Sequence, residues 1–339
     1  MPRLTKNPLG LLMFLIGAGS CTRQSSDPWY ANERLLYAGI PVTVRFQPAD
    51  EALGRAVFRY LEQADDVFND YRPESELGQL NQAPAGKPFR VSAALANVLR
   101  LSLEMHTLTE GAFDITVGPL IRAWKEAAKR GTPLTEEELA RTLASIGASK
   151  IALRGQDVTF LASGMRLDLG GIAKGHFVDQ AVSQLRRKNI RAAMVQIGGE
   201  TAVFGLSSTG KPSVIGIRHP EDMHRIWSFI QDPGTGLSVS TSGNYNRPIR
   251  IADTTFYHIV DPRTGRPIAT ELLSITVAFP GSGKNALADA LSTAGAILGP
   301  ARFLPLAQKI GAEALLILRE NGKIQERKTP GWDRLARPR

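Results

Sequence analysis

Residues 192–204, AAMVQIGGETAVF, hold two short apolar runs that follow each other with no helix between them. Each run, Ala192–Ile197 and Thr201–Phe204, has the length typical of a strand. Further strand candidates are grouped in the same way, at Pro41–Phe46, Val158–Leu161, Val214–Ile217, Leu237–Ser240, Tyr257–Val260, Ile275–Ala278 and Ala314–Leu318. Because grouped strands lack the strict strand–helix alternation of a doubly wound fold, we expect an α+β fold with mixed or antiparallel sheets flanked by helices.

Helices are predicted between the groups of strands. Residues 50–68 carry apolar side chains at helical spacing, namely Leu53, Val57, Leu61, Ala64 and Phe68. Ser92 and Thr135 are the expected N-caps of two further helices. Residues Gly175–Lys188 and Asn285–Leu298 complete the set, and the second of these is apolar enough to be buried.

The start of the chain has the pattern of a secretory signal: basic residues, an apolar run over Leu9–Ile16 and small residues before Cys21. That run is too short to span a bilayer. Cys21 is the only cysteine in the chain, which excludes an internal disulfide and favours a bacterial lipid anchor at this residue. The alternative is plain signal cleavage after Ser20. We therefore expect a protein on the periplasmic side of the bacterial inner membrane, lipid-anchored or else soluble in the periplasm.

The predicted organisation has four parts: a signal peptide over residues 1–20, an anchor linker over 21–34, one domain over 35–325 and a solvated basic tail over 326–339. The formal net charge is +9, but basic residues alternate with acidic ones and aromatic residues make up only 7% of the chain. This scattered charge lacks the basic patch that nucleic-acid binding requires, so we expect no nucleic-acid partner.

A glycine-rich stretch, LDLGGIAKGHFVD over residues 167–179, opens into one of the predicted helices. Its glycines allow backbone N–H groups to approach an anion, and the helix start adds free N–H donors. Lys174 adds a positive charge, while Asp168 precedes the glycines. The pattern is not a P-loop, because no Ser or Thr follows a Gly-Lys pair. A tight strand-to-helix turn with a surface lysine is the alternative.

Hard oxygen donors occur on the predicted helix NALADALSTAGAIL, where Asp289 and Thr293 are four residues apart and share a face. Such donors suit Mg²⁺. The alternative is an Asp289–arginine pair with Thr293 bonded to its own helix. The fragment PGSGKN just before this helix departs from the P-loop pattern, and we expect an ordinary loop there.

Two further motifs offer single polar residues. In GAFDITVGPL, Asp114 follows Phe113 and can bind a ligand or cap the next turn. In FYHIVDPRTGRPI, His258 precedes an Asp-Pro turn, where it can act as a general base or serve only the structure. STSGNYNR, residues 240–247, is an equally ambiguous polar loop.

In order, the motifs GAFDITVGPL, LDLGGIAKGHFVD, MVQIGGE, STSGNY, YHIVDPRTG and ALADALSTA resemble the ApbE family of FAD:protein FMN transferases. The resemblance covers roughly residues 35–320 and implies a two-lobed single catalytic unit. It also implies an Mg²⁺-dependent transfer of FMN from FAD to a Thr or Ser hydroxyl of another protein, with a phosphoester formed and AMP released.

The same resemblance assigns roles to residues of this chain. Gly171, through its carbonyl, Asp289 and Thr293 match the metal ligands of the family. Cofactor contacts are implied for Tyr71, Ala112, Phe113, Asp114, Asp168, Lys174, His258 and Ile259. His258 matches the position of a base and Lys174 that of a charge acting on the phosphates. Ala38-Gly39-Ile40 departs from the Met-Gly-Thr common in the family, and Asn69-Asp70 replace small hydroxyl residues.

The sequence leaves two other functions open. An FAD pyrophosphatase would use the same residues, with water in place of the protein hydroxyl. A non-catalytic periplasmic flavin-binding lipoprotein would need neither His258 nor the metal ligands. The resemblance further implies a protein partner, a flavoprotein subunit of a membrane redox complex whose acceptor motif has a Gly-Ala-Thr core.

Overall fold

The computed structural model describes residues 27–243, 249–251, 254–256, 259–268 and 271–337. The predicted signal peptide and Cys21 lie outside these ranges and stay predictions. Among the helices of the described ranges, none combines the length and the apolar character that crossing a bilayer requires.

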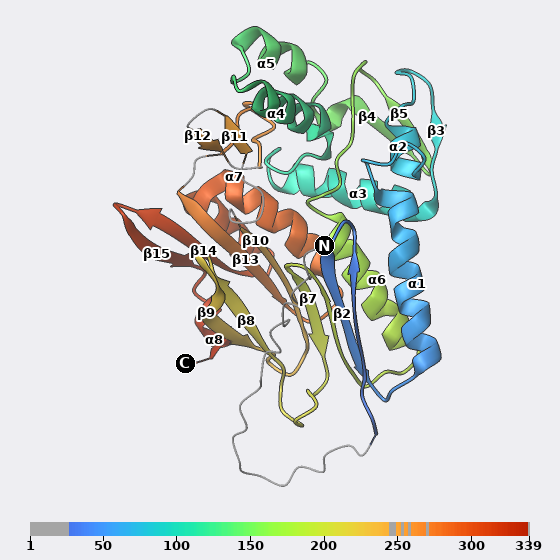
Figure 1. Ribbon diagram of the computed structural model, residues 1–339, viewed down its shortest axis with the longest axis vertical. Coiled ribbons are helices and arrows are strands. Elements are labelled where there is room, and N and C mark those ends of the chain that lie inside the picture. Colours follow the sequence, from blue (N-terminus) through green and yellow to red (C-terminus); the bar gives the residue numbers. More distant parts are fainter. Residues whose placement is uncertain (1–26, 244–248, 252–253, 257–258, 269–270, 338–339) are drawn as a thin grey trace, which may run out of the picture.

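A large antiparallel sheet forms the centre of the described chain (Figure 1). Its eight strands run in the order β1 (Tyr30–Leu36), β2 (Ile40–Gln47), β6 (Ala192–Ile197), β7 (Glu200–Phe204), β10 (Leu237–Gly243), β13 (Leu272–Pro280), β14 (Glu313–Glu320) and β15 (Lys323–Lys328). The stretch 192–204 gives β6 and β7, which pair as a hairpin from Ala193↔Phe204 to Ile197↔Glu200. Side chains alternate along β10, so that Leu237 and Val239 lie on one face of the sheet and Ser240 meets a helix on the other.

Three helices cover the first face: α1 (Glu51–Phe68), α6 (Ala173–Arg187) and α7 (Asn285–Lys309). Asp50 caps α1 by accepting a hydrogen bond from the Leu53 amide at 2.9 Å, and the predicted apolar face is buried. The second face is covered by a small sheet, β8 (Val214–His219), β9 (Asp222–Gln231) and β16 (Ala336–Arg337), together with α8 (Trp332–Leu335).

A second group of elements lies at one end of the large sheet (Figure 1). It contains the helices α2 (Glu76–Leu80), α3 (Ala93–Leu108), α4 (Gly118–Arg130) and α5 (Glu136–Leu143), the 3-10 turns η1 (Ile115–Val117) and η2 (Ala148–Lys150), the sheet β3 (Phe89–Arg90), β5 (Asp157–Phe160) and β4 (Ile151–Arg154), and the hairpin β11 (Ile249–Ile251) and β12 (Thr254–Phe256). The capping box predicted at Thr135 is present, with Glu138 as its partner.

The α+β class is confirmed, and each strand pairing of the described chain is antiparallel. Both predicted ends of the domain are wrong. The supposed linker 21–34 contains most of β1, which pairs with β2 from Tyr30↔Phe46 onward. The expected tail is not wholly solvated, because within its described residues 326–337 Trp332 and Leu335 are buried at 2% and 5% exposure beneath the sheet. Burial of these two side chains stabilises the segment, while the charged end of Arg334 between them stays in solvent.

Candidate active site at the start of helices α6 and α7

The first turns of α6 and α7 meet closely, and Gly175 makes this possible. A Cβ atom at this position would overlap the Asn285 carbonyl oxygen and lie 2.7 Å from the Ala286 nitrogen. Asp179 then fixes the start of α7, since its carboxylate accepts hydrogen bonds from the Asn285 and Ala286 amides at 2.8 and 2.9 Å. Burial raises the pKa of Asp179 to about 6. The expected loop before α7 is confirmed, and it binds a carboxylate of this chain.

Lys174 and Asp289 form a buried ion pair across this junction. The Lys174 ammonium lies 3.2 and 3.1 Å from the two carboxylate oxygens of Asp289, and it also donates to the Gly170 carbonyl at 3.0 Å. The Gly175 amide donates to the same carboxylate at 3.1 Å. The Lys174 side chain is 28% exposed, but in this state its ammonium is held by Asp289 and is not free to meet a phosphate. The predicted alternative for Asp289, an arginine partner, is wrong because a lysine takes that place.

A second carboxylate, Glu200 at the start of β7, reaches the same ammonium. Its Oε1 atom lies 3.7 Å from Lys174 Nζ, and the residue is 1% exposed. Burial and the neighbouring Asp289 raise the pKa of Glu200 well above its usual range. Burial acts against the charge of Lys174, but Asp289 and Glu200 outweigh it, so the pKa of the ammonium is raised. Sequence reasoning quoted the motif MVQIGGE but missed Glu200, because only the fold brings it to α6 and α7.

Gly171, Thr293 and Phe113 converge beside this ion pair. A Cβ atom at Gly171 would lie 2.9 Å from the Thr293 hydroxyl oxygen and 3.3 Å from the Phe113 ring. The Asp289 carbonyl, which a back-bonded Thr293 would use, instead accepts from Ser292 at 2.9 Å. Gly171 and Thr293 thus lie side by side, and Asp289, one turn before Thr293 on α7, is linked to the same glycine loop through Lys174. Carboxylate, hydroxyl and carbonyl oxygens are the donors that Mg²⁺ prefers. Among the described residues, no group of three or more His, Cys, Asp or Glu side chains is placed to hold a metal ion.

The segment Ala112–Asp114 is buried rather than open to solvent, with exposures of 1%, 3% and 6%. Asp114 caps η1 by accepting from the Thr116 amide at 2.8 Å, and its other oxygen accepts from the Ala148 amide at 3.1 Å. His106 lies 3.2 Å from the same carboxylate. The capping alternative for Asp114 is confirmed, so this carboxylate supports the wall of the site through the segment that carries Phe113.

The His106–Asp114 pair gives a pH-dependent stability. The hydrogen bond to Asp114 raises the pKa of His106. Burial opposes the charge of Asp114, but hydrogen bonds from His106 and Thr116 outweigh it and lower that pKa. A raised histidine pKa stabilises the fold below about 6.5 and the effect is lost as the pH rises through the folded value. A lowered aspartate pKa stabilises above about 4 and is lost in more acidic solution.

We therefore expect His106→Gln to cost about 1–2 kcal/mol more of the free energy of unfolding at pH 5.5 than at pH 9. Denaturant unfolding at the two pH values measures this difference. The control is His224→Gln, a change at an exposed position on β9. Equal losses for His106→Gln at both pH values would show that the ion pair contributes nothing beyond packing.

Tyr71 provides an exposed aromatic surface near the glycine loop. Its side chain is 65% exposed, and the Lys125 ammonium donates to its hydroxyl at 2.8 Å while lying 4.7 Å from the ring centre.

Neighbouring Asp70 is held by Arg166, at 3.9 Å between charged atoms. Burial and the charge of Asp168 raise the pKa of Asp70 to about 6. Asp168 itself accepts from the Gly170 amide at 2.7 Å and shapes the loop. Sequence reasoning gave no signal for Lys125 or Arg166.

The region of the Asp-Pro turn is described only in part. Tyr257 and His258 lie outside the described residues, as does the second half of the polar loop 240–247, residues 244–247. Ile259 lines a narrow crevice together with Ser242, Ile275 and Ala296, at the ends of β10 and β13 and beside α7. The predicted turn after it is present, with the Gly265 amide donating to the Asp261 carbonyl at 2.7 Å.

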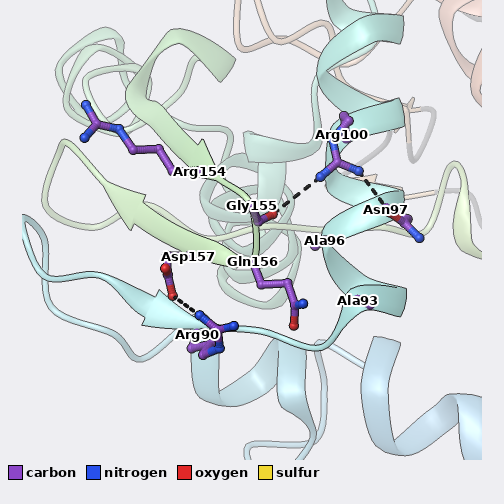
Figure 2. A pocket seen from close by; sticks show the side chains of 9 residues that line it. All are labelled: Arg90, Ala93, Ala96, Asn97, Arg100, Arg154, Gly155, Gln156 and Asp157. Carbon is purple, nitrogen blue, oxygen red and sulfur yellow. Dashed lines mark hydrogen bonds and ion pairs between the residues drawn. The ribbon is translucent and has the colours of Figure 1, made fainter.

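A cavity of about 340 Å³ lies elsewhere, between α3 and the sheet β3–β5–β4 (Figure 2). It is lined by Arg90, Ala93, Ala96, Asn97, Arg100, Arg154, Gly155, Gln156 and Asp157. Two of its arginines already have partners, since Arg90 lies 3.4 Å from Asp157 and Arg100 donates to Asn97 at 2.9 Å. The predicted site residues do not line this cavity, and the junction of α6 and α7 remains the candidate site.

Comparisons with known proteins identify the relatives of this chain. The model of the ApbE family matches residues 38–316. A FAD:protein FMN transferase of Vibrio cholerae is 33% identical over 280 residues, covering 81% of this chain and 82% of that protein. One of Haemophilus influenzae is 34% identical, covering 78% of each. Among solved structures, the flavinyl transferase ApbE of Pseudomonas stutzeri superposes with a TM-score of 0.80 at 27% identity, covering 91% of this chain and 97% of that one.

Proposed function

Because the chain belongs to the ApbE family, we propose that it transfers FMN from FAD to a Thr or Ser hydroxyl of an acceptor protein. The acceptor oxygen attacks the phosphorus of the FMN half, the pyrophosphate bond breaks, and AMP leaves while a phosphoester forms. The observation that carries this proposal is the convergence of Gly171, Asp289 and Thr293 beside the glycine loop. Phosphoryl transfer needs mainly positioning and charge neutralisation, which such a site can supply.

The site's oxygen donors suit an Mg²⁺ ion held by Asp289, Thr293 and the Gly171 carbonyl. When bound, this ion supplies positive charge to the phosphates. The protein's own residues do the rest. The Gly175 amide holds the Asp289 carboxylate in place, and Phe113 closes one side of the site against Gly171. Tyr71 offers an exposed ring on which a flavin or adenine can stack.

We propose His258 as the base that takes the proton of the acceptor hydroxyl. The basis is its place in the motif YHIVDPRTG, directly before Ile259, which lines the crevice at the site. His258→Ala is expected to bind FAD with unchanged affinity and to transfer FMN about 10²–10⁴-fold more slowly, the usual contribution of general base catalysis. FAD fluorescence titration and single-turnover transfer measure the two quantities. Wild-type turnover in this variant would refute the role.

The acceptor that fits this proposal is a flavoprotein subunit of a membrane redox complex, with a Gly-Ala-Thr core at the modified hydroxyl. A lipid anchor at Cys21 would hold the enzyme on the periplasmic side of the inner membrane, close to such a complex. Export of the Cys21→Ser variant tests the anchor. The unchanged protein is expected in the membrane fraction and the variant in the soluble periplasm.

Intact-mass analysis of an acceptor fragment tests the central reaction. The full chain is incubated with FAD, Mg²⁺ and a fragment that carries the acceptor threonine. The proposal predicts a mass gain of one FMN joined as a phosphoester, absent when EDTA is added. An unchanged fragment with free FMN and AMP in solution would instead show an FAD pyrophosphatase. If FAD stays intact with each of several acceptor fragments, the protein would instead be one that binds flavin without transferring it.

A further inference from the structure

Two acidic side chains share one lysine at the start of α6 and α7. Two carboxylates, Asp289 and Glu200, are 2% and 1% exposed, yet both reach a single ammonium, that of Lys174. Within the described residues, the Oε2 atom of Glu200 has no hydrogen-bond partner. Burying an unpartnered carboxylate oxygen costs stability, so its presence calls for an explanation.

Lys174 is shared unequally between the two carboxylates. Its Nζ atom lies 3.1 Å from Asp289 Oδ2 and 3.7 Å from Glu200 Oε1. A lysine side chain has a long flexible stem, so a short movement transfers the ammonium from one carboxylate to the other. Glu200 is fixed by comparison, because it begins β7 and pairs with Ile197 and Ser240 in the middle of the large sheet.

The ammonium now occupies the carboxylate that the proposed Mg²⁺ would use. Both oxygens of Asp289 face Lys174, and one of them also accepts from Gly175. A divalent cation at Asp289 would therefore lie within a few ångströms of a positive charge. In a site that is largely shielded from water, this repulsion opposes binding of the cation.

We propose that Lys174 moves from Asp289 to Glu200 when a divalent cation binds, and that Glu200 is thus a positioning residue that sets the cation affinity of the site. The inference rests on the proposed function, because it takes Asp289 as a metal ligand. The unpartnered oxygen of Glu200 then has a role: it is the place that receives the ammonium. Without Glu200, the cation and Lys174 would compete for one carboxylate.

Mn²⁺ binding to the full chain, followed by the electron paramagnetic resonance signal of free Mn²⁺, tests the inference without any turnover. Reversal of binding by Mg²⁺ establishes that both ions use one site. Glu200→Gln, which keeps the shape of the side chain, is expected to weaken Mn²⁺ binding at least about tenfold. Lys174→Met is expected to tighten it. Glu313→Gln is the control, since it makes the same change at a largely buried carboxylate of β14 whose partners are Thr329 and Arg334.

The double variant decides whether Glu200 acts through Lys174. In the Lys174→Met background, Glu200→Gln is expected to weaken binding by no more than about threefold, because no ammonium remains to be received. An equal effect of Glu200→Gln in both backgrounds, or none in either, would overturn the inference. Failure of the unchanged protein to bind Mn²⁺ would overturn the proposed metal site as well, so the two failures are distinguishable. Thermal unfolding of each variant shows that it is folded.

Discussion

Asp289→Ala is expected to abolish FMN transfer, with a loss of about 10³-fold or more even at high Mg²⁺ concentration, because it removes the only carboxylate in the proposed ligand set. Asp289 is 2% exposed and lies between Lys174 and Gly175. Thr293 and the Gly171 carbonyl are neutral donors and do not replace its charge. Single-turnover transfer, followed by the mass of the acceptor, measures the loss.

The alanine variant alone does not separate a lost ligand from a disturbed junction of helices. It also leaves the Lys174 ammonium and the Gly175 amide without their common acceptor. Asp289→Asn is therefore the matched variant, because its amide oxygen still accepts from Gly175 while the charge is absent. We expect it to keep the unfolding temperature within a few degrees and to transfer FMN as poorly as the alanine variant. Measurable transfer by either variant with excess Mg²⁺ would contradict the assignment of Asp289.

The sequence predicted best those elements whose structure is determined mainly by the residues within them. The helix over 50–68 follows from apolar spacing, and α1 begins and ends within one residue of it. The strands β1 and β15 were missed for the same reason. Residues 30–36 carry the polar run Asn32, Glu33 and Arg34 in their middle, and 323–328 are almost wholly polar, so neither stands out as an apolar run. Both lie at the two edges of the large sheet, where charged side chains are tolerated and discourage pairing with another molecule.

The site was predictable only where family motifs contain its residues. Gly171, Asp289 and Thr293 do converge, although 118 residues separate Gly171 from Asp289 in the chain. The residues that pair with Lys174 and Asp114 were not predictable, since these contacts arise from the packing of separate elements. Glu200 reaches Lys174 because β7 lies under α6, and His106 reaches Asp114 because α3 ends beside η1. Hydrophobic periodicity reports on one helix or strand at a time. It carries no information about which elements contact each other in the fold.

Gly175→Ala is expected to destabilise the protein by about 3 kcal/mol, because the added methyl group meets backbone atoms of α7 that cannot rotate away. Its Cβ would overlap the Asn285 carbonyl oxygen and lie 2.7 Å from the Ala286 nitrogen. Denaturant unfolding measures the loss. Gly170→Ala is the control in the same loop, where the nearest atom to an added Cβ is a carboxylate oxygen of Asp168 at 3.0 Å.

That carboxylate ends a rotatable side chain, so we expect Gly170→Ala to cost less than about 1 kcal/mol. The Gly175→Ala substitution is also expected to affect the proposed metal site. If α6 and α7 separate to admit the methyl group, the Gly175 amide moves away from Asp289 and no longer holds this carboxylate in place. Gly175→Ala should then weaken Mn²⁺ binding as well as stability. Unchanged stability of this variant would show that the close approach of α6 and α7 does not require Gly175.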